Sequence, residues 1–286
     1  MSSQITTAFV NQYSSNIQML SQQMGSLLRN AVDVESVSAE KAFFDQVGSA
    51  AAVLRTTRHA DTPLIDTPHS RRMVTMSDYE YADLIDDQDK VRLLVDPTST
   101  YARAAAAAMG RAMDDVIIAA AIGTAKTGKD GSTSTALPSG QKVVHGSASL
   151  TIAKLLSAKE ILDEGSVDPS IPRYIVCAPK QITSLLGTTQ VTSSDFNTVK
   201  ALAQGQMDTF SGFKFIVSNR LTTDGDGNRA VIAFAGDGLK MAMGKEPTAR
   251  IDERSDKSYA TQVYYCQTIG ATRMEEAKVV EIACTE

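Results

Sequence analysis

Cysteine is scarce in this 286-residue sequence, and so is any surplus of positive charge. The cysteines are Cys177, Cys266 and Cys284, an odd number at wide spacings that fits neither a disulfide scaffold nor a paired-cysteine zinc or redox site. Lysine and arginine total 28 against 33 acidic residues, and the net charge of −5 is too low for binding driven by phosphate contacts. These absences disfavour a disulfide-rich scaffold and a dedicated nucleic-acid-binding protein.

Glycine and proline are also few, at 18 and 8 residues, so no collagen-like or low-complexity class applies. A content of 43% hydrophobic and 21% charged residues is that of a folded soluble protein. The first charged residue is Arg29, and 15 of the first 28 residues are Ser, Thr, Asn or Gln. We therefore expect neither a secretory signal nor a membrane span there, and we expect the chain to act in a reducing, cytosolic environment.

Apolar residues recur at steps of three and four in the uncharged N-terminal segment, as on one face of a helix. They are Val10, Tyr13, Ile17, Leu20, Met24, Leu27 and Ala31. Flanking charges are lacking, which argues against a coiled coil, so the pattern predicts an amphipathic helical arm. Two roles remain open: the arm docks on another surface, or its helix packs on the chain's own core.

A basic stretch is followed at once by an acidic one. Residues 48–75 contain two prolines and four arginines without helical periodicity, so we expect an extended excursion. The arginines are Arg55, Arg58, Arg71 and Arg72. Residues 72–85 alternate loosely, as a half-exposed strand does, and residues 78–96 carry seven acids.

A helix start is marked by Asp96-Pro97-Thr98, where a capping side chain stands beside a proline. The segment from 98 to 125 includes 11 alanines. A helix of that length would be about 42 Å long. The loop that follows, at 123–147, is rich in Gly, Ser, Thr and Lys, and this composition predicts mobility.

The rest of the chain alternates between helix and strand patterns, which indicates the α+β fold class. We expect helices over 149–164, 179–187 and 195–203. We expect strands over 173–178, 212–217, 230–234, 239–243, 259–269 and 277–283, with an Asp-Gly turn at 224–228.

Candidate chemical sites fail on composition or context. Residues 123–130 nearly match a phosphate-binding loop, but Asp130 replaces the magnesium-binding hydroxyl and the loop follows a helix. Residues 224–228 imitate the start of a calcium loop without its later glutamate. Cys177 has no local histidine partner for nucleophilic catalysis. An alternative stays open, in which a divalent metal on the aspartate cluster makes the chain a metal-dependent soluble α+β enzyme. The cluster is Asp86, Asp87 and Asp89.

The order of these elements resembles the major capsid protein of tailed bacteriophages: an arm, an extended loop, an acidic strand and a long alanine-rich helix. The segments that carry the resemblance are 72–79 with 82–87 (strand to spine helix), 173–179 with 181–186 (axial strand and helix), 212–219 (strand after the axial tip), and 270–273 with 279–282 (closing peripheral strands). The resemblance covers nearly the whole chain.

The resemblance implies the tailed-phage major capsid fold. Its parts would be an N-terminal arm at 1–47, an extended loop at 48–75, a peripheral domain at 76–148 and 236–286 with a spine helix over about 98–123, and an axial domain at 149–235. It implies a structural protein without enzymatic activity, cofactor or metal. Copies would form hexameric and pentameric capsomers of an icosahedral head. A nanocompartment shell of similar fold is a further alternative.

The resemblance also implies partners. Scaffolding, portal and decoration proteins would join the shell, which would enclose double-stranded DNA without sequence-specific binding and without a membrane. The chain would lie in the virion capsid, and in the host cytoplasm during assembly. Some family members weld subunits through a lysine in the extended loop. No lysine lies between Lys41 and Lys90, so we expect no such cross-link here.

Contacts between subunits are the site that the charge runs predict. Four arginines in residues 55–72 and seven acids in residues 78–96 are poorly explained by one isolated surface. We expect Arg55, Arg58, Arg71 and Arg72 to meet acids of a neighbouring copy, with Asp86, Asp87 and Asp89 as the candidates.

Overall fold

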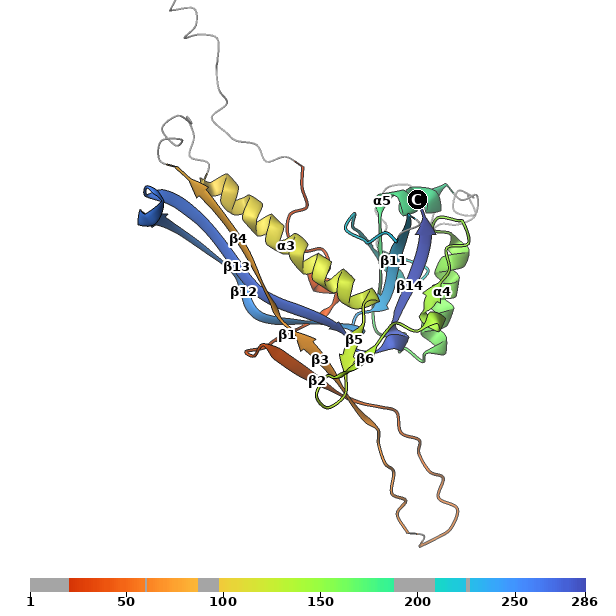
Figure 1. The fold of residues 1–286 in the computed structure, drawn as a ribbon. Coiled ribbons are helices and arrows are strands. Elements are labelled where there is room, and N and C mark those ends of the chain that lie inside the picture. Colours follow the sequence, from red (N-terminus) through yellow and green to blue (C-terminus); the bar gives the residue numbers. More distant parts are fainter. Residues whose placement is uncertain (1–20, 60, 87–97, 188–208, 225–226) are drawn as a thin grey trace, which may run out of the picture. The chain divides into compact units, whose positions relative to one another are not determined.

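A computed structural model describes residues 21–59, 61–86, 98–187, 209–224 and 227–286 (Figure 1). The predicted helix over 195–203 and the first part of the N-terminal apolar stripe lie outside the described residues. The chain divides into two compact units. The first takes its residues from 1–26, 78–113 and 245–268, and the second from 27–77, 114–244 and 269–286.

The first unit contains most of helix α3 (Thr98–Ile122) and of strand β4 (Ser77–Ile85), with parts of β12 (Leu239–Arg254) and β13 (Ala260–Arg273). The 3-10 turn η3 (Ser255–Lys257) lies between the last two strands, which are neighbours in the sheet order β1-β12-β13-β4. Gln267 of β13 donates its Nε2 hydrogen to the Met109 carbonyl of α3 at 3.1 Å, in a buried position. The predicted long helix is confirmed, and no helix among the described residues has the length and apolar character of a membrane span.

The described part of the N-terminal arm is not an α-helix. Its one regular turn is the 3-10 helix η1 (Arg29–Ala31), and Gly25 adopts φ +78°. A Cβ placed on Gly110 of α3 would lie 2.3 Å from the Gly25 carbonyl carbon, so the arm's backbone crosses α3 at a point where only glycine fits. The predicted amphipathic helix is therefore wrong over residues 21–28, because close backbone contact with α3 outweighs the apolar periodicity.

The second unit contains a six-stranded mixed sheet. Its strands, in order, are β7 (Lys142–Val143), β14 (Val279–Thr285), β11 (Asn228–Ala235), β8 (Arg173–Cys177), β10 (Phe213–Val217) and β9 (Thr209–Phe210). Helix α4 (Ile152–Glu164) packs on β14, starts at the Thr151 cap and ends at Gly165. Helix α5 (Pro179–Leu186) follows β8 and ends before Gly187. The glycines that follow both helices and the proline that starts α5 thus mark the helix ends as predicted.

The last strand of the chain pairs with a strand of the six-stranded sheet. β14, which follows the 3-10 turn η4 (Glu276–Lys278), pairs antiparallel with β11 from Asn228↔Thr285 to Phe234↔Val279. The segment 279–282, which the resemblance places among the closing peripheral strands, therefore lies beside β11. The physical reason is core packing: Val279, Val280 and Ile282 are fully buried beside the buried β11.

A four-stranded sheet in the second unit carries the base of the extended loop. Its order is β2 (Lys41–Val47), β3 (His69–Thr75), β5 (Ala125–Thr127) and β6 (Thr133–Thr135). Phe44 and Val74 form a core with Ala242 of β12, whose first residues pair in parallel with β1 (Asp33–Ser36). Residues on alternate positions of β2, such as Asp45, face away from that core.

The segment predicted as a mobile loop, 123–147, is partly regular, since it contains β5, β6, the 3-10 turn η2 (Ser139–Gln141) and β7. Arg273 is 0% exposed, and its Nη1 and Nη2 groups donate to the carbonyls of Gly123 and Thr135 at 2.8 and 3.1 Å. The prediction missed this anchor because Arg273 lies far along the chain from the segment that it holds.

Candidate assembly surfaces

The stretch between β2 and β3 is a long loop with an exposed apolar content. The Gly48 N–H donates to the Pro68 carbonyl at 2.8 Å and closes its base, and the described residues beyond that bond form neither helix nor strand (Figure 1). Leu54 is 84% exposed and Leu64 is 99% exposed. The last residues of the predicted excursion over 48–75 belong to β3, so its irregular part ends at residue 68.

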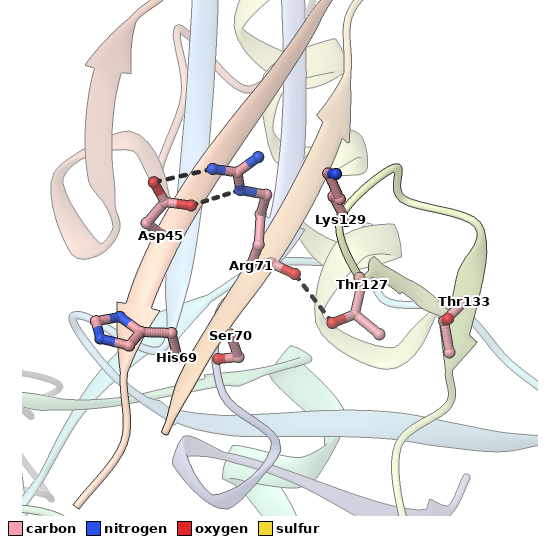
Figure 2. A pocket seen from close by; sticks show the side chains of 8 residues that line it. Asp45, His69, Ser70, Arg71, Thr127, Lys129 and Thr133 are labelled. Atoms are coloured by element: carbon pink, nitrogen blue, oxygen red, sulfur yellow. Dashed lines mark hydrogen bonds and ion pairs between the residues drawn. The ribbon is translucent and has the colours of Figure 1, made fainter. Parts of the chain in front are cut away.

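A hollow of about 660 Å³ lies at the base of this loop, between the β2–β3 pair and the turn from β5 to β6 (Figure 2). It is lined by Asp45, His69, Ser70, Arg71, Thr127, Gly128, Lys129 and Thr133. The lining is polar and basic, with a single carboxylate.

Asp45 and Arg71 form a two-pronged ion pair inside this hollow. Arg71 Nε and Nη2 donate to the two carboxylate oxygens at 2.6 and 3.3 Å, across directly paired positions of β2 and β3. The hydrogen bond from Arg71 lowers the pKa of the Asp45 carboxyl, so Asp45 is ionised at neutral pH. The Arg71 guanidinium also lies 5.4 Å from the centre of the Phe43 ring.

Arg72, one residue further on, faces the opposite side of β3 and is only 7% exposed. Its Nε donates to the Met274 carbonyl at 2.8 Å, and its Nη2 contacts a Glu276 carboxylate oxygen at 2.6 Å. These bonds of the Arg72 side chain are thus to residues of its own chain. Strand alternation after the first arginine could have indicated that one of the two faces inward.

The other predicted contact residues are exposed or lie outside the described residues. Arg55 and Arg58 are exposed on the loop, and Arg55 Nε donates to the Thr57 carbonyl at 3.0 Å. Asp86 is exposed just after β4. The described residues do not include Asp87 and Asp89.

The rejected chemical motifs have structural explanations. The calcium-like turn is held by Asp224, whose carboxylate accepts from the backbone N–H and the side-chain amide of Asn228 at 2.7 and 3.0 Å. The segment that nearly matches a phosphate-binding loop is the β5–β6 hairpin, which joins strand to strand instead of strand to helix. Within the part of the chain that the structure describes, no three His, Cys, Asp or Glu side chains gather as metal ligands would.

The cysteines differ in their surroundings. Cys177 and Cys284 are buried, and burial raises the pKa of their thiols to about 12 and about 11. Cys266 is partly exposed, with its Sγ 3.0 Å from the Lys245 ammonium nitrogen. Neither of the two buried thiols has the low pKa of a nucleophile.

Sequence reasoning did not place Asp45 and Lys129 beside Arg71, since Asp45 received no role and Lys129 was considered only within the rejected near match to a phosphate-binding loop at 123–130. The alternation in residues 41–47 could have placed Asp45 on an outward face. Lys129 could not have been placed, because β5 pairs with β3 only through contacts that are distant in sequence, such as Arg72↔Thr127.

Comparison with known proteins identifies relatives of this arrangement. A family model described as phage capsid protein matches residues 5–286. The capsid structure of the cyanophage P-SCSP1u is 16% identical at a TM-score of 0.78, over 99% of this chain and 94% of that one. The capsid of Ralstonia phage GP4 is 12% identical at a TM-score of 0.73, over 97% and 95%. The capsid of the native GTA particle is 13% identical at a TM-score of 0.70, over 98% and 96%. No curated protein sequence matches the chain.

Proposed function

We propose how this chain works from one premise: it belongs to the phage capsid protein family and is a structural major capsid protein. In this proposal its copies form hexameric and pentameric capsomers and then the icosahedral head of a tailed phage, around double-stranded DNA. The observation that carries the mode of assembly is the extended loop, whose Leu54 and Leu64 are 84% and 99% exposed. The family favours a structural role over the metal-dependent enzyme.

The loop would lie on a neighbouring copy. Moving a large apolar side chain out of water is favourable, and fully burying a leucine stabilises a contact by about 1.5–3 kcal/mol. Leu54 and Leu64 would together contribute about 3–6 kcal/mol per copy if a neighbour covered them. A loop of this length reaches further than a compact turn, which is what contact with another copy requires.

Charge would set which surfaces meet. Arg55 and Arg58 are exposed on the loop, and Asp86 is exposed after β4, so these three are suited to pairing between copies. Asp87 and Asp89 complete the acidic run in the same proposal. Arg71 and Arg72 already bind acids of their own chain, so a role for them between copies would be shared with those bonds.

The remaining partners follow from the family and from charge. The net charge of −5 means that the shell would enclose DNA without holding it tightly. Scaffolding, portal and decoration proteins would join during assembly in the host cytoplasm. The division into an arm, an extended loop, a peripheral domain and an axial domain stays part of this proposal.

A paired apolar substitution tests the loop's role. The variant Leu54→Ser/Leu64→Ser should fold with an unchanged circular dichroism spectrum and unfolding midpoint, but should form at least tenfold fewer shells by sedimentation and electron microscopy. Val144→Ser is the matched control, since Val144 is 76% exposed but lies outside the loop. Normal shells from the double variant would contradict the proposal, as would an equal loss in the control.

A separate measurement distinguishes a phage head from a nanocompartment. Particles purified from infected cells should contain nuclease-protected double-stranded DNA. Particles that contain a folded protein cargo and no DNA would favour the nanocompartment instead.

A further inference from the structure

The basic hollow at the base of the extended loop has features that assembly does not require. Arg71 and Lys129 bring two positive charges to it, and Asp45 brings one negative charge, so these three side chains carry a net charge of +1. Among the described residues, Lys129 has no ion-pair partner, and Asp130 beside it does not line the hollow. In the view of Figure 2, the Arg71 guanidinium lies between Asp45 and Lys129.

The hairpin that carries Lys129 is fixed against β3. The Thr127 hydroxyl donates to the Arg71 carbonyl at 2.9 Å. A Cβ placed on Gly131 would lie 2.3 Å from the Met73 sulfur, so the end of the hairpin packs tightly on β3. Gly128 takes φ +92°, a conformation that other residues rarely adopt. The backbone that positions Lys129 beside Arg71 is therefore held before any ligand arrives, which reduces the entropy lost on binding.

The Arg71 guanidinium has hydrogen-bond donors that do not bind Asp45. Its Nε and Nη2 groups serve Asp45, and no bond to its Nη1 group occurs among the described residues. The Nη1 group of Arg71 and the Lys129 ammonium are donors from separate segments that line the same hollow (Figure 2), and the Thr133 hydroxyl lines it from the other strand of the hairpin. Several donors from separate segments suit an oxyanion with several acceptor oxygens.

We propose that this hollow binds a phosphate group, held by Lys129 and by the free side of the Arg71 guanidinium. The volume of about 660 Å³ exceeds that of a bare phosphate and therefore admits two sources of the phosphate group. One is free phosphate, and the other is a nucleotide whose organic part fills the remaining space. The Asp45 carboxylate limits the affinity, because its charge opposes that of the ligand. Binding in the millimolar range is expected, and this inference stands whether or not the loop docks on a neighbour.

Calorimetric titration of the unassembled full-length chain tests the site, with inorganic phosphate and deoxyadenosine monophosphate as separate probes and chloride as the ionic-strength control. Lys129→Ala should weaken phosphate binding roughly tenfold, the expected effect of losing one charge-assisted hydrogen bond. Asp45→Asn should strengthen it about fivefold, the size of a unit-charge interaction at about 4 Å in water. General positive charge would shift affinity in the same two directions, so a lysine that lies nearby but does not line the hollow is needed as the control.

Lys126→Ala is the matched control. Lys126 is an exposed lysine of the same hairpin, but its ammonium donates to the Ser134 hydroxyl at 2.8 Å and it does not line the hollow. It should change phosphate affinity less than twofold. An equal loss in Lys126→Ala, weaker binding in Asp45→Asn, or no phosphate binding at tens of millimolar would each overturn the proposal. Tighter binding of the nucleotide than of phosphate would identify the nucleotide as the source of the phosphate group.

Discussion

Asp114 fixes the N-terminal arm to α3 through a buried carboxylate. Its two oxygens accept the backbone N–H groups of Leu27 and Leu28, each at 3.1 Å. Asp114 and Leu28 are both 0% exposed, so water does not replace a lost bond at Leu28. We predict that Asp114→Ala destabilises the folded chain and frees the arm.

The magnitude follows from these two bonds. A hydrogen bond to a charged group contributes roughly 1.5–3 kcal/mol, and a buried amide left without an acceptor costs a similar amount. Leu27 is 41% exposed and regains a bond to water, so only one of the two amides is left unpaired. The free energy of unfolding should therefore fall by about 3 kcal/mol in Asp114→Ala. The amide oxygen of Asp114→Asn still accepts one bond, so that variant should lose less.

The neighbouring residue supplies the control. Asp115 pairs with Arg220, and the two side chains are 44% and 36% exposed. Such a surface pair contributes roughly 0–1 kcal/mol, so Asp115→Ala should lie in that range. Urea unfolding of the unassembled chain measures both variants, and amide hydrogen exchange at Leu28 reports the arm directly. If Asp114→Ala costs no more than Asp115→Ala, the carboxylate does not hold the arm and the reasoning fails.

Three further outcomes are expected. Since the raised thiol pKa values of Cys177 and Cys284 exceed the ordinary 9.0, the unfolded chain loses these protons first. The free energy of unfolding should therefore be highest below pH about 9 and should fall by roughly 1.4 kcal/mol per pH unit per thiol toward pH 11. Urea unfolding at a series of alkaline pH values that shows no such fall would contradict this. Boiled and reduced particles should migrate as one band near the monomer mass of 30.6 kDa, and a ladder would reveal covalent links. The variant Arg55→Glu/Arg58→Glu should block assembly, and adding Asp86→Lys to it should partly restore assembly. Equal shell yields from the double and the triple variant would show that the arginines and Asp86 are not partners.

The helices could be predicted because their ends are written locally. The Asp-Pro-Thr sequence before α3, Pro179 at the start of α5 and the glycines after α4 and α5 each set a boundary within a few residues. The α+β class follows from the same alternation. None of these inferences needs a contact between distant segments.

Errors arose where a distant contact overrode a local pattern. The periodicity of the arm favours a helix, but the crossing of Gly25 over Gly110 imposes an irregular path. The apolar run of β14 indicates a strand without indicating its partner. The hairpin at 123–147 looked mobile because its anchor, Arg273, is 150 residues away from Gly123. Sheet partners and buried anchors of this kind are tertiary information.

The same limit explains why the candidate surface was only half predicted. Sequence marks the basic, extended loop, and its exposure follows from its composition. The hollow depends on residues of four strands and one turn that meet through sheet pairing. The position of Lys129 beside Arg71 follows only from that pairing.

The four arginines of the loop region are divided between two tasks by their position. Arg71 and Arg72 lie on a paired strand, where alternation sends one to Asp45 and the other to Glu276, so they fix the strands from which the loop departs. Arg55 and Arg58 lie beyond the closing bond of the loop, where no strand presents an acid to them. The ion pairs of Arg71 and Arg72 hold the base of the loop in place, and the exposed arginines and leucines of the loop favour a partner there. In the proposed assembly a second molecule would stabilise the loop, whereas ion pairs within the chain stabilise its base.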